Sequence, residues 1–486
     1  TLFQYIKGLS SRQAFFNLRP METFKLHSQH KKILADTLTP VSAYLKIRDV
    51  FPHSLLLESS DYHANNKNFS YICCNPIASM ELKNKHLTIK YPDGTSSSEQ
   101  LTSGANIPER IHQFSQQFKS EDYPFKFISN GIFGYIAHDA VEHFENLELN
   151  QKKEGLDIPE IFYAVYQNII AISLFNHEAH LFSHVFDGEH NVEDIEQLLQ
   201  AKNSTRFAFE KVGEKTSNLT DSDFIDFVNK GKQHCYRGDV FQLVLSRRFS
   251  QKFKGDEFNV YRTLRSINPS PYLFFFDYGD FKIFGSSPEA QIIVEESKAE
   301  IHPIAGTFKR TGNDAQDKQA ALELAKDPKE NSEHVMLVDL ARNDLSRNGS
   351  NVVVEKNREI QFFSHVIHLV SKVTCTMKKA AKTFQVVADT FPAGTLSGAP
   401  KHNALKLIDR YEKTKRNFYG GAIGYMDFKG NFNHAIIIRS FLSKNQELHY
   451  QAGAGIVADS VPKNELQEVY NKLGALDKAL ILAEDV

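Results

Sequence analysis

The stretch of sequence that most constrains the fold runs from Thr390 to Lys472, near the C-terminus. Glycine, small and hydroxyl-bearing residues are unusually dense in three parts of it. Such segments let backbone N–H groups approach a bound anion closely, because little or no side chain stands in the way. The stretch therefore predicts a site for a small acid, and its three dense parts are 393–398, 420–424 and 453–455.

The last of these segments leads directly into a predicted helix over Val461–Leu473. Pro462 suits the first turn of a helix, and the spacing of Glu465 and Glu468 places both carboxylates on one face. Two carboxylates beside an anion-binding turn would repel the ligand unless a cation lay between them. This arrangement is the first indication of Mg²⁺.

Composition limits the class of protein. With 41% apolar residues and a net charge of -2, the chain is typical of a soluble globular protein with no electrostatic preference for nucleic acid or membrane. Its longest apolar runs, Ile169–Phe175 and Tyr272–Phe276, are far shorter than the roughly 20 residues of a membrane-spanning helix. The cysteines show no metal-ligand spacing and are expected to be reduced thiols in a cytoplasm: Cys73, Cys74, Cys235 and Cys375.

Hydrophobic patterning divides the chain into a peripheral segment, 1–30, and two larger regions. Over 31–210, alternating apolar and polar residues beginning at Thr39 predict antiparallel strands, with a helix over Ile107–Phe118. The polar segment 203–222 is expected to be a linker, with a boundary near residue 215. Mixed strands and helices over 222–486 then predict a second region, so the fold class is α/β.

A second helix matches the one near the C-terminus. The pattern over Pro328–Arg342 predicts a helix that begins at the proline and carries Glu330 and Glu333 in its first turns. Two such helices meeting over one site would supply four carboxylates for a metal and its waters. The spacing alone is equally compatible with two solvated helix faces that carry favourable charge at their N-termini.

Five further blocks, with the C-terminal stretch, resemble the chorismate-utilising enzymes, and most closely their anthranilate synthase component I branch. The blocks are NPSPYLFFF at 268–276, GSSPEA at 285–290, PIAGT at 303–307, ENSEHVMLVDLARNDL at 330–345 and SHVIHLVSKV at 364–373. The resemblance covers nearly all of the chain past residue 40. It implies the family fold, which has two β-rich subdomains with flanking helices around a central cleft.

The resemblance also implies a reaction. Chorismate carries two carboxylates, a C4 hydroxyl and an enolpyruvyl ether; ammonia would add at C2 as the C4 hydroxyl leaves, and pyruvate would then be eliminated. The departing hydroxyl needs a general acid, and the carboxylates need cations and N–H donors. The matching catalytic positions are Glu289, His368 and Thr395. The matching substrate positions are Gly306, Thr307, Tyr419, Arg439, Gly453, Ala454, Gly455 and Lys472.

Mg²⁺ is the implied cofactor, holding the ring carboxylate of chorismate. The family's metal ligands fall on Glu333 and Glu468, with Glu330 and Glu465 as a second pair. These are hard oxygen ligands, which suit Mg²⁺.

Two positions bear on which reaction a family member catalyses. Family members that add water carry a lysine base where this chain has Gln242, and a neutral amide cannot deprotonate water. Enzymes that make 4-amino-4-deoxychorismate often carry a nucleophilic lysine where this chain has Ala305. Anthranilate formation is therefore favoured, with aminodeoxychorismate synthesis and a noncatalytic tryptophan-sensing subunit as alternatives.

A partner and an inhibitor are implied as well. No cysteine has the setting of a glutaminase nucleophile, so ammonia is expected from a separate glutamine amidotransferase subunit, component II. Two segments resemble the family's feedback site for L-tryptophan, with an acidic or hydroxyl group for the ammonium and an apolar wall for the indole. The residues concerned are Glu58, Ser59, Asn268, Pro271, Tyr272 and Leu273.

Overall fold

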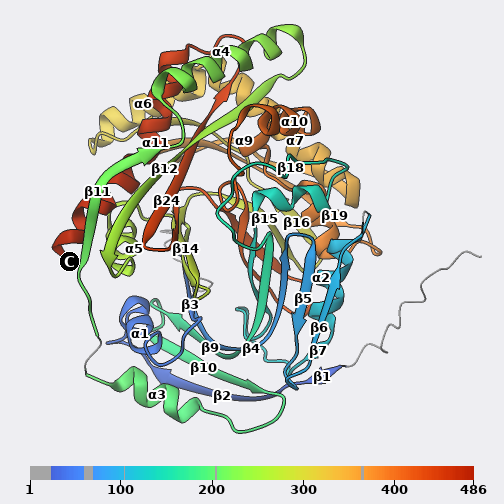
Figure 1. Ribbon diagram of the computed structural model, residues 1–486, viewed down its shortest axis with the longest axis vertical. Coiled ribbons are helices and arrows are strands. Elements are labelled where there is room, and N and C mark those ends of the chain that lie inside the picture. The colour runs from blue at the N-terminus through green and yellow to red at the C-terminus, as the bar shows by residue number, and fades with distance from the viewer. Residues whose placement is uncertain (1–22, 60–68, 103, 203–204, 363–365) are drawn as a thin grey trace, which may run out of the picture.

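The structure is a computed structural model, and it describes residues 23–59, 69–102, 104–202, 205–362 and 366–486 of the 486-residue chain. It confirms the predicted α/β class: long antiparallel strands cross the molecule and helices lie along its periphery (Figure 1). Most of the predicted peripheral segment, 1–30, lies outside the described residues, although strand β2 begins at His27 within it. Among the described helices, none is long and apolar enough to cross a bilayer.

The N-terminal part is mainly antiparallel sheet, as predicted. Strand β9 is central to it and pairs with β4, β8 and β10, while β10 also pairs with β2. The strands of this part are β1 (Phe24–Lys25), β2 (His27–Leu34), β3 (Leu55–Glu58), β4 (Ser70–Lys83), β5 (His86–Lys90), β6 (Ser96–Gln100), β7 (Phe118–Lys119), β8 (Ile132–Ile136), β9 (Ile161–Ser173) and β10 (Glu178–Val185). Its helices are α1 (Pro40–Ile47), α2 (Ile107–Gln116), η1 (His138–His143) and α3 (Val192–Gln200).

The prediction of a strand from Thr39 was wrong, because helix α1 occupies this segment. Thr39 is its N-cap: the side chain accepts a hydrogen bond from the Ser42 N–H, and the Ser42 hydroxyl bonds back to the Thr39 N–H. This reciprocal capping, with Pro40 in the first turn, satisfies helix-end donors that a strand would leave to a neighbour. Capping therefore outweighed the alternation of apolar residues.

The C-terminal part alternates strands and helices. Its strands are β11 (Phe209–Ser217), β12 (Gln242–Gly255), β13 (Tyr272–Asp277), β14 (Phe281–Ser287), β15 (Ala290–Glu295), β16 (Lys298–Ile301), β17 (Ile304–Lys309), β18 (Gly349–Phe362), β19 (Val366–Met377), β20 (Gly398–Ala399), β21 (Ala422–Met426), β22 (Phe432–Ile436), β23 (Ser440–Lys444) and β24 (Glu447–Ile456). Its helices are α4 (Asp221–Arg237), α5 (Phe258–Ile267), α6 (Asp314–Lys326), α7 (Pro328–Asn348), α8 (Thr383–Thr390), α9 (Gly394–Ser397), α10 (Lys401–Tyr411), α11 (Pro462–Leu482) and η2 (Ala483–Asp485).

The segment expected to be a linker, 203–222, contains strand β11, so this expectation was wrong over Phe209–Ser217. The strand pairs along β12, and past its first residue it is mostly exposed, which explains why its sequence is polar. Strand pairs β3–β13 and β8–β21 also join the two halves of the chain. The division into 31–210 and 222–486 stays a prediction.

Helix α11 shows how the core positions the candidate site. Val469, Leu473, Leu476 and Leu480 recur every three to four residues and are all buried. The burial of each such side chain contributes about 1.5–3 kcal/mol. This face packs against β24 and α5, so Glu468 and Lys472, which lie off this face, are held at a fixed position beside β24.

Candidate active site

One edge of strand β24 forms the first wall of the candidate site. Strand β23 stops pairing with β24 at Tyr450, whereas β12 pairs with it further on. The segment 453–455 (Gly453, Ala454 and Gly455) therefore lies beyond β23, inside a regular strand rather than the turn that the sequence suggested. Here the Gly453 carbonyl accepts a hydrogen bond from Lys472 Nζ at 2.8 Å, and the Gly453 backbone bonds to the Tyr419 hydroxyl.

The Gln242 side chain lies against the backbone of Gly455. A Cβ atom on Gly455 would lie 2.6 Å from Gln242 Nε2. Gln242 is buried, and within the part of the chain that the structure describes its Oε1 has no hydrogen-bond partner. The Gln242 amide is thus placed beside the β24 edge.

Glu289 lies between β14 and β15 and is a buried carboxyl of the site. Only 9% of the residue is exposed, and Thr395 Oγ1 on helix α9 donates a hydrogen bond to Glu289 Oε1 at 3.1 Å. Burial raises the pKa of the Glu289 carboxyl to about 8, although Thr395 and the charge of Lys472 act in the opposite direction. Glu289 is therefore protonated at neutral pH and can donate a proton.

His368, on strand β19, is a neutral imidazole of fixed tautomer. Its Nδ1 lies 2.7 Å from the Gly306 carbonyl, which can only accept, so Nδ1 carries the proton and Nε2 is the basic nitrogen. Burial lowers the pKa of His368; the bond to Gly306 raises it and the charge of Arg439 lowers it further. The ring can therefore take up a proton at Nε2.

Gly306, on β17, requires the conformational freedom of glycine. Its φ is 67°, and a Cβ atom there would lie 2.7 Å from Leu324 Cδ1 and 3.1 Å from Glu330 Oε2. The Glu330 carboxylate of helix α7 therefore lies beside Gly306, whose carbonyl accepts the hydrogen bond from His368. The neighbouring Thr307 lies on β17, and its side chain is outside the described part of the structure.

Arg439 and Tyr419 form a cationic and hydroxyl-bearing wall. Arg439 lies between β22 and β23, and its backbone φ is 51°. This left-handed backbone conformation is rare for residues other than glycine and often occurs at functional sites. Its Nη1 donates to the Lys472 carbonyl at 3.0 Å. Burial raises the pKa of Tyr419 to about 12, so its hydroxyl stays protonated.

Mutual electrostatic effects link these groups in one site. The charge of Arg439 acts on His368 and on Tyr419, and that of Glu468 acts on Arg439. Lys472 acts on Glu289 and forms an ion pair with Glu468, with 2.6 Å between Nζ and Oε1. The structure thus brings the acid, the imidazole and the cationic groups of the sequence prediction together.

The four carboxylates predicted as metal ligands lie on the first turns of α7 and α11. Glu465 is buried, and the other three are partly exposed: Glu330, Glu333 and Glu468. Within the described ranges no three His, Cys, Asp or Glu side chains gather closely enough to enclose a metal on their own. The donor set nevertheless fits Mg²⁺, which is commonly held by one or two carboxylates, with waters and an anionic ligand completing its shell.

A separate cavity of about 200 Å³ lies where β3, β13, β21 and β22 meet, and we call it the aromatic cavity. It is lined by Leu57, Glu58, Ser59, Phe69, Tyr71, Pro271, Tyr272, Phe274, Ile423, Gly424, Tyr425, Asn433 and Ala435. Of the residues predicted for a tryptophan site, Glu58, Ser59, Pro271 and Tyr272 line it. Asn268 and Leu273 are not lining residues, and Leu273 is buried in the core.

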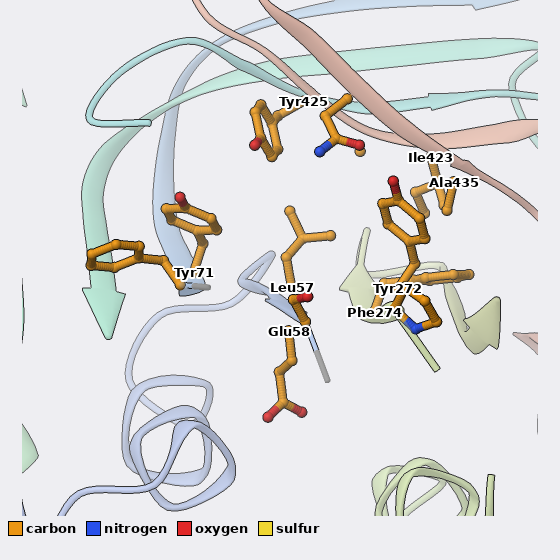
Figure 2. A pocket seen from close by; sticks show the side chains of 13 residues that line it. Leu57, Glu58, Tyr71, Tyr272, Phe274, Ile423, Tyr425 and Ala435 are labelled. Carbon is orange, nitrogen blue, oxygen red and sulfur yellow. The ribbon is translucent and has the colours of Figure 1, made fainter. Parts of the chain in front are cut away.

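The Glu58 carboxylate faces away from this cavity. Figure 2 shows the Leu57 side chain among the aromatic rings and the Glu58 carboxylate directed to the other side. Arg265 Nε and Nη2 donate to its two oxygens at 2.8 and 2.9 Å, and the Tyr261 hydroxyl donates at 2.6 Å. The carboxylate predicted to hold an ammonium group is thus already paired with a guanidinium.

The sequence did not indicate three polar side chains that also line the aromatic cavity. Tyr71, Tyr425 and Asn433 come from strands β4, β21 and β22, which are far apart in the sequence. Alternation along each strand indicates that one face is buried, but it does not show which faces share a cavity. Only the strand pairing reveals this grouping.

The chain is similar to known proteins along nearly its whole length. Residues 54–478 match the family described as chorismate binding enzyme. Anthranilate synthase component 1 of Aquifex aeolicus is 34% identical, with 96% of each chain covered. The protein of the same name from Bacillus subtilis is 37% identical, with 93% of this chain and 91% of the relative covered.

Solved structures give the same result for the fold. The crystal structure of anthranilate synthase component I from Streptococcus pneumoniae has a TM-score of 0.73 and 30% identity, and covers 92% of this chain and 99% of that one. The menaquinone-specific isochorismate synthase of Escherichia coli has a TM-score of 0.71 at 17% identity, covering 94% and 95%, and shows a shared fold alone. The fold predicted from the sequence motifs is confirmed.

Proposed function

The chain belongs to the family of chorismate binding enzymes, and we propose that it is the large subunit of an anthranilate synthase. The reaction converts chorismate and ammonia to anthranilate, pyruvate and water. Identity of 34–37% to proteins named anthranilate synthase component 1, along nearly the whole chain, supports the assignment. The single observation that carries it is the buried Glu289 carboxyl, which Thr395 holds by a hydrogen bond and whose pKa is raised by burial.

Glu289 is the general acid for loss of the C4 hydroxyl. As ammonia forms its bond to C2, the C4–O bond breaks and the hydroxyl leaves with the Glu289 proton as water; the added nitrogen then gives up one proton, which restores the Glu289 carboxyl. Thr395 donates to Glu289 Oε1 and so fixes the orientation of the carboxyl group. General acids placed in this way typically contribute 10²–10⁴-fold to a rate.

His368 serves the elimination that follows. Because its Nδ1–H is bound to the Gly306 carbonyl, Nε2 is the atom that accepts the proton lost from C2. The C3–O bond then breaks, the ring becomes aromatic, and the enolpyruvyl fragment takes up a proton to become pyruvate. Atoms balance, with one water and one pyruvate released for each ammonia added.

The substrate carboxylates are bound by the cationic wall. Arg439, the Tyr419 hydroxyl and the outer edge of β24 at Gly453 form a cluster of donors suited to the enolpyruvyl carboxylate. Bound Mg²⁺ would hold the ring carboxylate and draw electron density from the diene. Its ligands are Glu333 and Glu468, with Glu330 and Glu465 as the second pair.

Ammonia is supplied by a partner glutaminase, component II. Burial raises the thiol pKa of all four cysteines, to about 12 for Cys74 and about 11 for Cys235, and so makes each a poor nucleophile. A glutaminase needs an activated thiolate, so the activity belongs on another chain. The unpaired thiols fit a cytoplasmic location.

L-Tryptophan is a feedback inhibitor that occupies the aromatic cavity. The cavity offers aromatic side chains for an indole, and tyrosine hydroxyls and the Asn433 amide for polar groups. Because Glu58 is paired with Arg265, these neutral groups and Ser59 rather than Glu58 meet the ammonium group.

The experiment that tests the proposal is anthranilate fluorescence from the purified chain with chorismate, Mg²⁺ and an ammonium salt at mildly alkaline pH. Fluorescence that appears without a partner and is abolished by EDTA is expected. Consumption of chorismate without fluorescence would instead identify an aminodeoxychorismate or isochorismate product. Chorismate left intact, with and without a glutaminase partner, would contradict an enzymatic role.

A further inference from the structure

Arg416 is a fully buried charged residue whose side-chain hydrogen bonds, within the described residues, reach none of the groups expected to contact substrate. It follows helix α10 and is only 2% exposed. Its Nε and Nη2 donate to Glu412 Oε2 and Oε1 at 2.8 and 2.6 Å, which is a bidentate ion pair. Burial raises the pKa of Glu412, but the charge of Arg416 and hydrogen bonds from Arg416 and Ser246 outweigh it and hold the pKa below its usual value, so the carboxyl is ionised.

The remaining donors of Arg416 reach two other elements. Nη1 donates to the Leu396 carbonyl of helix α9 at 2.6 Å, and Nη2 donates to the Val244 carbonyl of β12 at 2.8 Å. Glu412 Oε1 in turn accepts from the backbone N–H and the hydroxyl of Ser246 at 2.9 and 2.7 Å. One ion pair therefore ties together α9, α10 and β12.

Two of these elements, α9 and β12, carry or adjoin residues of the candidate active site. Leu396 follows Thr395, which binds Glu289. In the β12–β24 ladder, Val244 is opposite Gly455 and Ser246 is opposite Gly453. The guanidinium also lies 5.7 Å from the ring centroid of Tyr419, whose backbone N–H donates to the Arg416 carbonyl.

We propose that the Arg416–Glu412 pair is a positioning device that holds three walls of the site in register: Thr395 on α9, Tyr419, and the β24 edge at 453–455. This inference rests on the proposed function. Neither residue takes part in the chemistry; both act through the residues they hold. Carboxylate–guanidinium geometry is rigid and bidentate, which suits a device that must fix three elements at once.

A second buried ion pair provides a matched control. Arg48 Nη1 donates to Asp256 Oδ1 at 3.1 Å and its Nη2 bonds to the other carboxylate oxygen; these side chains are 12% and 11% exposed, against 2% and 5% for Arg416 and Glu412. Among the described residues, no hydrogen bond of Arg48 reaches the candidate site. Arg416→Lys and Arg48→Lys each keep the charge and lose the planar fork, so a purely structural role predicts the same outcome for both.

The test measures kcat/KM for chorismate per folded protein, the melting temperature, and amide hydrogen exchange. We expect Arg416→Lys to lower kcat/KM about tenfold or more relative to Arg48→Lys, because small misplacements of catalytic groups are costly. Exchange should be faster at 394–398 and 453–456 in Arg416→Lys alone. Equal kcat/KM for the two variants, with no segment-specific exchange, would overturn the proposal.

The test also covers two other cases: an Arg416→Lys variant that does not fold, and a wild-type chain that forms no anthranilate. If Arg416→Lys does not fold, Ser246→Ala removes one hydrogen bond to Glu412 and one from Gln451, and should lower kcat/KM per folded protein severalfold; wild-type values in both kinetics and exchange would overturn the proposal. If the wild-type chain forms no anthranilate, the proposed function fails. In that case amide exchange alone decides whether the pair holds the three walls.

Discussion

The candidate active site and the aromatic cavity each contain a buried glutamate, and the two are held in opposite ways. Glu289 is 9% exposed and has a threonine hydroxyl as its hydrogen-bond donor, with the charge of Lys472 nearby. Glu58 is 6% exposed and receives both arms of the Arg265 guanidinium and a tyrosine hydroxyl. The two carboxyls thus differ in their partners: within the described residues, a guanidinium pairs with Glu58, whereas a neutral hydroxyl bonds to Glu289.

The largest expected effect is that of Glu289→Gln. The amide keeps the size and the hydrogen bond to Thr395 but has no acidic proton, so kcat should fall about 10²–10⁴-fold. Anthranilate fluorescence at saturating chorismate and ammonia measures this. A kcat within a factor of about two of wild type would show that Glu289 is not the acid.

Arg439 and Arg265 extend the comparison between the candidate active site and the aromatic cavity. Arg439→Lys keeps the charge but loses the fork that suits a carboxylate, so KM for chorismate should rise about tenfold or more. Arg265→Lys, its control, changes only the partner of Glu58 and should leave KM unchanged. Initial rates against chorismate concentration separate the two outcomes, and an unchanged KM in Arg439→Lys would remove the residue from the substrate wall.

Filling the aromatic cavity should affect inhibition without affecting catalysis. Leu57→Trp places an indole among the rings that line the cavity (Figure 2), so the concentration of L-tryptophan for half inhibition should rise about tenfold or more. The kcat should stay at its wild-type value. Inhibition of the variant at wild-type concentrations would place the tryptophan site elsewhere.

The smallest effect is expected from Glu58→Gln. This change breaks the ion pair with Arg265, a residue about one-third exposed, and should cost about 1–2 kcal/mol of unfolding free energy. Its kcat should equal that of wild type, in contrast to Glu289→Gln. Urea unfolding with a parallel assay tests both parts; a large loss of kcat would make the two glutamates functionally alike.

The sequence predicted the fold class and the helices over Ile107–Phe118, Pro328–Arg342 and Val461–Leu473, because local patterns and the family motifs carry this information. The roles of the site residues stay a prediction. The prediction from the sequence was wrong at Thr39, where a side-chain cap decides between helix and strand, and at β11, whose polar residues form an edge strand. Both errors arise where a few hydrogen bonds outweigh average composition.

Side-chain contacts between residues far apart in the sequence could not be predicted. Arg265 lies about two hundred residues from Glu58 in the sequence, and no local pattern shows that the two form an ion pair. Likewise Arg416 contacts Val244 and Leu396 from a different element, although its pair with Glu412 has ordinary helical spacing. The pKa values of buried groups depend on such partners, so they could be assigned only from the structure.

The measurement that tests the account most directly is the pH dependence of kcat at saturating free ammonia and Mg²⁺. Because the acid must be protonated, the account predicts a constant kcat at neutral pH and a decline above a pKa of about 8. Since the Thr395 hydrogen bond lowers this pKa, Thr395→Val should move the decline to higher pH. A kcat that stays level through mildly alkaline pH, or a decline that Thr395→Val leaves in place, would contradict the assignment of Glu289 as the general acid.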